Sequence, residues 1–191
     1  MKTKTINLYK FEELTDDQKQ IVLDKNRDFN MDIDLLEYDE IHTIKLKELG
    51  FNNPEIACSL SYSQGDGASF TCTELDYNLL LKDYTGKHKK WFIQILQYYV
   101  EVQIERTCHH YYHELTCRTE YYDRLPLGCP RIQTELETIV NYIENLREQA
   151  CLELKRDLQA DIDYLQSDEA IAETLIANEY YFNGETLEIE Y

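Results

Sequence analysis

Five residues whose side chains bind metals or act as nucleophiles cluster in one short segment: Cys108, His109, His110, His113 and Cys117. Thiolate and imidazole are common zinc ligands, and a Cys–His pair can form an activated nucleophile. The spacing matches no common zinc site, and the flanking residues alternate as in strands, which would direct these side chains to different faces. The chain also has no phosphate-binding loop, GxSxG motif or HExxH motif. We therefore predict no metal, no cofactor and no enzymatic activity, and a metal-assisted enzyme is the least favoured alternative.

The six cysteines, at positions 58, 72, 108, 117, 129 and 151, include no CxxC pair. The N-terminus lacks the apolar segment of a signal peptide, and no run of eighteen apolar residues could cross a membrane. We therefore expect a cytoplasmic protein with reduced thiols. Cys58 and Cys72 alternate with apolar neighbours and are expected to be buried.

The net charge is the strongest signal in the composition. The chain has 37 Asp and Glu against 19 Lys and Arg, a formal charge of −18. Such a charge repels nucleic acids and anionic membranes and attracts basic surfaces, of which nucleic-acid-binding proteins carry the largest. The acidic residues are concentrated in residues 11–40, with a net charge of −8, and in residues 133–191, with −12.

Part of this acid lies in helical patterns near the C-terminus. Carboxylates one helical turn apart are about 5.4 Å apart along the axis, close to the spacing of phosphates on a nucleic-acid strand. Such a row could mimic nucleic acid in a basic groove, although a solvated helix face is the simpler alternative. The candidate partner-binding residues in this region are Glu137, Glu144, Glu148, Asp157, Asp161, Asp168 and Glu169.

The sixteen tyrosines give a second indication of binding, because tyrosine combines apolar area with a polar tip and is enriched at interfaces. Tyr111, Tyr112 and His113 fall in a predicted hairpin connection. Gln64 and Asp66 fall in another predicted turn. These five residues complete the set of candidate partner-binding residues.

The elements that must position these residues follow from periodicity and turn signals. Helices are expected over 15–28, 33–49, 87–99, 131–166 and 167–178. Strands are expected over 5–9, 56–62, 68–73, 100–106, 115–122, 180–182 and 187–189. This order predicts an α+β fold, with an antiparallel sheet of two β-hairpins plus terminal strands, packed with helices, and a long acidic C-terminal helix. Residues 1–130 form the predicted core domain, and residues 131–191 an acidic helical segment that completes the same domain.

Several segments resemble a family of small bacteriophage and mobile-element proteins. They are YKFEEL at 9–14, DKNR at 24–27, SYSQGDGASF at 61–70, Tyr112-His113-Glu114, and residues 176–182. The resemblance covers most of the chain, and some members carry an antitoxin-like description. A phage origin implies inhibition of host defence, most concretely an anti-CRISPR protein that blocks an RNA-guided nuclease at its basic channel.

We therefore predict an inhibitory binding protein that occupies a basic nucleic-acid-binding surface of a host protein. The expected partner is a nuclease or CRISPR effector in the host cytoplasm, with no direct contact to nucleic acid or membrane. The alternative is an antitoxin-like or small-ligand-binding module that uses no charge mimicry.

Overall fold

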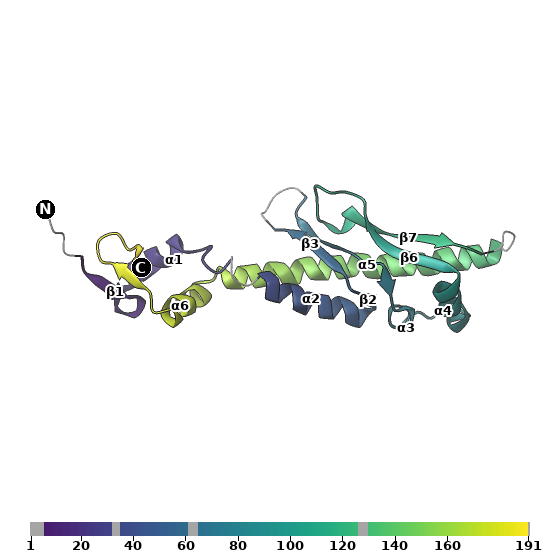
Figure 1. Ribbon diagram of the computed structural model, residues 1–191, viewed down its shortest axis with the longest axis horizontal. Coiled ribbons are helices and arrows are strands. Elements are labelled where there is room, and N and C mark those ends of the chain that lie inside the picture. Colours follow the sequence, from purple (N-terminus) through teal and green to yellow (C-terminus); the bar gives the residue numbers. More distant parts are fainter. Residues whose placement is uncertain (1–5, 32–34, 61–64, 126–129, 191) are drawn as a thin grey trace. The chain divides into compact units, whose positions relative to one another are not determined.

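The computed structural model describes residues 6–31, 35–60, 65–125 and 130–190, without the side chains of residues 35–39. It confirms a mixed α+β fold with several small antiparallel sheets and a long helix near the C-terminus (Figure 1). The chain forms two compact units: unit 1 comprises residues 1–36 and 160–191, and unit 2 comprises residues 37–159.

This grouping differs from the predicted division at residue 130. Helix α5 (Pro130–Leu165) does begin there, next to the predicted start at residue 131. Its buried residues Leu136, Ile139 and Ile143, however, share one core with the strands of unit 2. An apolar helix face must be covered, and for most of α5 the hairpins that precede it in the chain provide the cover.

Unit 1 joins the two ends of the chain. Its elements are β1 (Leu8–Lys10), η1 (Phe11–Glu13), α1 (Asp16–Lys25), α6 (Asp168–Ala177), β8 (Tyr181–Asn183) and β9 (Ile189–Glu190). The strands form an antiparallel sheet in the order β1-β8-β9. Phe11 and Phe182 pack edge to face, with ring centroids 6.2 Å apart, in a core shared with Val22, Ile171 and Leu175.

Local capping explains where the helices of unit 1 begin. Thr15 accepts a hydrogen bond from the backbone N–H of Gln18 (3.4 Å), and the Gln18 side chain accepts one from the N–H of Thr15 (3.0 Å). Thr15 and Gln18 thus form a capping box at the start of α1, where the sequence predicts a helix from residue 15. Ser167 likewise caps α6 by accepting from the N–H of Ala170 (3.2 Å).

The described residues of unit 2 form two hairpins, a short strand pair, four α-helices and one 3-10 helix. The elements are α2 (Leu35–Leu49), β2 (Phe51–Asn52), β3 (Glu55–Ser59), β4 (Gly67–Thr71), β5 (Glu74–Leu75), α3 (Tyr77–Leu80), α4 (Lys89–Tyr98), β6 (Val100–Arg106), η2 (Glu114–Thr116), β7 (Cys117–Asp123) and most of α5. Helix α2 begins just before the unit boundary and ends at Gly50, whose φ of 107° suits a glycine.

The hairpins β3–β4 and β6–β7 form as predicted. A bridge between Cys72 and Ile104 connects them through hydrogen bonds of 2.7 and 3.1 Å. Within the described residues the strands form several small sheets in place of the predicted single one, and the terminal strands pair with each other in unit 1. Cys72 is buried as expected, but Cys58 is exposed. Among the helices within the described residues, none combines the length and apolar character that crossing a bilayer requires.

The core of unit 1 generates a test of the two-unit organisation. Phe182→Ala should destabilise unit 1 by about 3 kcal/mol, because it removes a fully buried ring. Tyr181→Ala is the matched control on the same strand, where the side chain is 44% exposed. Hydrogen exchange read by mass spectrometry should show lost protection in unit 1 peptides for Phe182→Ala alone. Equal loss in the peptides of unit 2 would contradict this organisation.

Candidate partner-binding site

The start of β4 lies beside η2 and the connection between β6 and β7. Tyr112 donates its backbone N–H to the carbonyl of Gly65 (3.3 Å). A Cβ added at Gly65 would lie 2.1 Å from Cδ1 of Tyr111, and one added at Gly67 would lie 2.5 Å from Cα of His113. Glycine is therefore required at both positions because Tyr111 and His113 approach the backbone closely, and not only because the sequence predicts a turn there. We name residues 65–67 and 107–116 the hairpin-tip surface.

Large apolar side chains are exposed on the hairpin-tip surface. Tyr111 is 49% exposed and Leu115 is 66% exposed, and His109 and His110 are exposed beside them. Tyr112 is half-buried under the guanidinium of Arg106, which lies 5.3 Å from its ring centroid. Exposed aromatic and aliphatic side chains held on a rigid backbone are typical anchors of protein interfaces.

His113 shapes this surface through its hydrogen bonds. Its Nδ1 accepts from the N–H of Leu115 (3.3 Å), and its carbonyl accepts from the N–H and the hydroxyl of Thr116 (2.9 and 2.7 Å). Asp66 accepts from the hydroxyl of Ser59 (2.9 Å). The structure thus brings together four predicted residues: Asp66, Tyr111, Tyr112 and His113. Gln64 lies outside the described residues.

The Cys and His residues between positions 108 and 117 do not converge. Within the part of the chain that the structure describes, no group of three or more His, Cys, Asp or Glu side chains is placed to hold a metal ion. Cys117 is buried, and its Sγ faces Cys151 and Arg147 and not the exposed His109 and His110. His109, His110 and His113 lie in the connection between β6 and β7, whereas Cys117 is the first residue of β7 and points into the core.

Three of the seven predicted acidic residues have basic partners within the protein. Glu144 pairs with Arg147 at 2.7 Å, Asp157 with Lys45 at 2.9 Å, and Asp168 with Arg27 at 2.5 Å. Asp161 is half-buried and also engaged. Glu137 and Glu169 are exposed, and Glu148 is half-buried.

The acidic residues of α5 also lie on two faces of the helix. Glu144 faces β7, where its carboxylate accepts the N–H of Thr119 (2.8 Å), whereas Asp157 faces Lys45 of α2. Glu137 and Asp157 are 20 residues apart on the same helix, which is about five and a half turns. The side chains of Glu137 and Asp157 therefore project in opposite directions. The acids of α5 therefore do not form the single continuous row that the sequence suggested.

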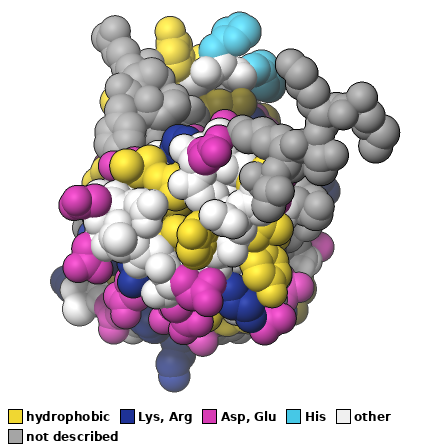
Figure 2. Space-filling view, turned by 90° about the vertical axis from the view of Figure 1, so that its left-hand side faces the viewer, with side chains coloured by type: hydrophobic (Ala, Val, Ile, Leu, Met, Phe, Trp, Pro, Cys, Tyr) yellow, Lys and Arg dark blue, Asp and Glu magenta, His cyan; other side chains and the backbone are white. Residues whose placement is uncertain are grey.

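The two units differ in charge. Unit 1 has 17 acidic and 6 basic residues, a net charge of −11, and its segment 160–191 has nine acidic residues and no lysine or arginine. Unit 2 has 20 acidic and 13 basic residues, a net charge of −7 over many more residues. In the view of Figure 2, acidic side chains lie among basic and hydrophobic ones. The acid on this face is therefore interspersed and does not form one uniform surface.

A buried arginine that the sequence did not single out organises the region beneath the hairpin-tip surface. Arg147 is 1% exposed and donates to both carboxylate oxygens of Glu144 (2.9 and 2.7 Å). Its Nη1 donates to the carbonyl of Glu114 in η2 (2.6 Å) and lies 3.2 Å from Sγ of Cys117. The sequence did indicate that Arg147 is buried, because it follows Ile143 by four residues and precedes Cys151 by four, on the buried face of α5.

The pKa of Glu144 reflects this pairing. Partial burial, the largest single effect, raises the pKa of the carboxyl, but hydrogen bonds from Arg147 and Thr119 outweigh it and hold the pKa below its usual range. The ionised carboxylate is thus stabilised in the folded state.

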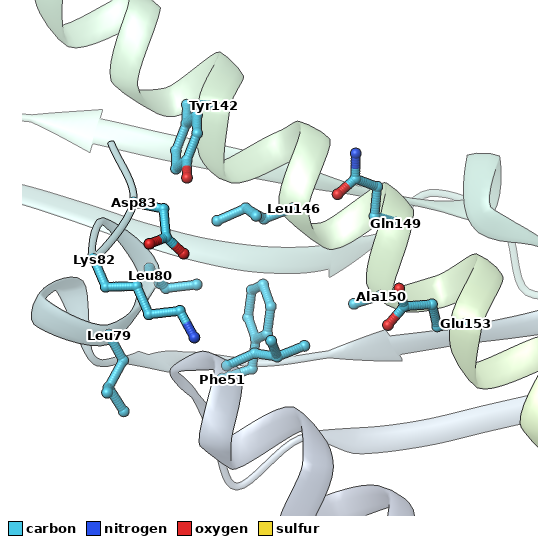
Figure 3. Close-up of a pocket in the computed structure, with 11 residues that line it drawn as sticks. Phe51, Leu79, Leu80, Lys82, Asp83, Tyr142, Leu146, Gln149, Ala150 and Glu153 are labelled. Atoms are coloured by element: carbon cyan, nitrogen blue, oxygen red, sulfur yellow. The ribbon is translucent and has the colours of Figure 1, made fainter. Parts of the chain in front are cut away.

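A shallow pocket lies between α5, Phe51 and the α3 region (Figure 3). Its floor is apolar, with Leu80 and Leu146, and Lys82 and Asp83 lie at its side. Its volume is about 100 Å³, well below the roughly 300–1,000 Å³ typical of small-molecule sites. Burial and the charge of Asp83 raise the pKa of Tyr142. This pocket is too small for a metabolite of ordinary size.

Arg147→Met should lower the free energy of unfolding of unit 2 by about 3 kcal/mol, because it leaves the Glu144 carboxylate and the Glu114 carbonyl unpaired. Arg156→Met is the matched control on the same helix: Arg156 is 73% exposed and pairs with Asp157 at the surface. The control should change stability by no more than about 0.5 kcal/mol. Urea unfolding followed through Trp91, the single tryptophan and a residue of unit 2, measures both.

The lowered pKa of Glu144 predicts a pH dependence. Its contribution to stability is complete above the usual glutamate pKa and is lost as pH falls through the lowered pKa of the folded state. Glu144→Gln should therefore reduce the difference between the urea midpoints at pH 7 and pH 3. Glu137→Gln, which changes an exposed side chain of the same helix, should leave that difference unchanged.

Comparisons with curated proteins and with solved structures found no match. A family described as a domain of unknown function (DUF8835) matches residues 34–168, which include all of unit 2 and therefore the hairpin-tip surface. The match spans well over half of the chain, and the protein belongs to this family.

Proposed function

We propose that the protein acts by binding another protein, and that the hairpin-tip surface makes the central contact. The observation that carries this proposal is the exposure of Tyr111 and Leu115 on a segment that packs closely against Gly65 and Gly67. A segment whose conformation is set by such contacts before binding has a lower entropic cost of ordering an interface. Large exposed apolar side chains supply the area that such an interface buries.

The partner that fits the charge is a basic nucleic-acid-binding surface of a host protein. Opposite charge accelerates encounter, and the net charge of −11 on unit 1 supplies most of the attraction. The narrower form of the proposal is a phage-encoded anti-CRISPR or other anti-defence inhibitor that acts on a nuclease in the host cytoplasm. It rests on the acidity and on the resemblance to phage proteins.

Mimicry of nucleic acid takes a modified form in this proposal. Glu144, Asp157 and Asp168 serve internal ion pairs. The acids left for a partner are exposed ones such as Glu137 and Glu169. The charge therefore steers association, while the hairpin-tip surface determines which protein is bound. An antitoxin-like neutraliser would share this contact but would show no dependence on the exposed acids.

The contact surface is tested by binding of the full chain to a purified, guide-loaded RNA-guided DNA nuclease. Combined Tyr111→Ser and Leu115→Ser substitutions should weaken binding at least tenfold, because they remove the apolar anchors (about 1.4 kcal/mol per tenfold). Tyr98→Ser is the control, since Tyr98 is 77% exposed and lies outside the hairpin-tip surface. Target DNA should compete with the protein. Binding that persists in the double variant would exclude this contact surface, and no binding to the nuclease would exclude the narrower form.

The role of charge is tested separately by association rates in rising salt. The rate should fall steeply between about 0.1 and 0.5 M salt, since screening shortens the range of attraction. Replacing three exposed acids with glutamine, Glu137, Glu169 and Glu188, should slow association while leaving dissociation nearly unchanged. A rate indifferent to salt and to these substitutions would refute electrostatic steering and favour the antitoxin-like alternative.

A further inference from the structure

Two buried thiols face each other between β7 and α5. The Sγ atoms of Cys117 and Cys151 lie 3.8 Å apart, and the side chains are 2% and 0% exposed. Nη1 of Arg147 lies 3.2 Å from the first sulfur and 3.6 Å from the second. A cation placed against two adjacent thiols is the arrangement that stabilises a thiolate.

The two thiols differ in their readiness to ionise. A hydrogen bond from the Cys151 thiol lowers the pKa of Cys117 to about 6; burial opposes this effect, and the charge of Arg147 adds to it. The same hydrogen bond and burial raise the pKa of Cys151. The Arg147 cation and the hydrogen bond between the sulfurs therefore favour a thiolate at Cys117 and a thiol at Cys151, as in a nucleophilic and a resolving cysteine.

We propose that Cys117 and Cys151 form a redox-sensitive site at which hydrogen peroxide converts the two thiols into a disulfide. The Cys117 thiolate attacks one peroxide oxygen, the O–O bond breaks, and hydroxide leaves as Cys117 becomes a sulfenic acid. The sulfur of Cys151 then attacks the sulfenic sulfur, the S–S bond forms, and water leaves. The hydroxide takes up the proton that Cys117 had released. In total, two thiols are oxidised, and one peroxide is reduced to two waters.

The site lies next to η2 and so to the hairpin-tip surface. Arg147 binds the carbonyl of Glu114 with the same nitrogen that approaches the sulfurs. A disulfide would remove the thiolate from this arrangement and would join β7 to α5 covalently. The inference does not depend on the proposed function, because it concerns only the chemistry of the pair.

Cys72 provides an internal control of equal burial. It is 2% exposed, like Cys117, but its Sγ lies against the carbonyls of Asn52 and Glu74, and burial raises its pKa. Any difference in reactivity between Cys72 and Cys117 therefore reports the local chemistry and not solvent access.

The experiment treats the reduced full chain with hydrogen peroxide under native conditions and maps the peptides by mass spectrometry. A linked Cys117–Cys151 peptide, lighter by two hydrogens and restored by dithiothreitol, is expected, with Cys117 reacting at least tenfold faster than Cys72. In Cys151→Ser, dimedone should trap a sulfenic acid at Cys117, and in Cys117→Ser no disulfide to Cys151 should form.

Equal reaction of Cys117 and Cys72 would overturn the proposal, as would a disulfide from Cys117 to Cys58 or Cys108 in place of Cys151. Because the peptide map of the unsubstituted chain distinguishes these outcomes, the test stands even if a serine variant fails to fold.

Discussion

The core of unit 2 is arranged around the buried guanidinium of Arg147, which reaches from α5 to η2 and β7. This guanidinium is buried, so its desolvation must be offset by well-placed hydrogen bonds. Two of these go to the Glu144 carboxylate on the same helix, and one goes to the Glu114 carbonyl in η2. Glu144 in turn accepts the backbone N–H of Thr119 in β7. One ion pair therefore holds α5, β7 and η2 in register.

The geometry of the hairpin-tip surface depends on this arrangement. η2 is held from within by Arg147 and from its own start by His113, which accepts from Leu115 and Thr116. With η2 in place, Tyr111 and His113 meet Gly65 and Gly67, where only glycine leaves enough room. The exposed side chains of the surface are therefore positioned by buried polar contacts and not by the turn residues alone.

The acidity of the chain serves two different purposes. Some carboxylates form ion pairs within the protein, where Lys45, Arg27 and Arg147 neutralise them. The others remain exposed and give each unit its negative charge, most densely in residues 160–191. Only the second group contributes to attraction over distance, because an internal ion pair has little net charge to act on a partner.

The sequence by itself determined the local structure of this protein. The hairpins follow from alternation, the starts of α1 and α6 from Thr15 and Ser167 as caps, and the start of α5 from Pro130, because each depends on residues close in the chain. Only the tertiary structure decided which strands pair, since β1 meets β8 across nearly the whole chain. It also decided which carboxylates are neutralised and that Cys117 lies against Cys151, because these contacts join residues whose separation carries no periodic signal. For the same reason the sequence indicated the tyrosines and histidines of the hairpin-tip surface but not the arginine that supports it.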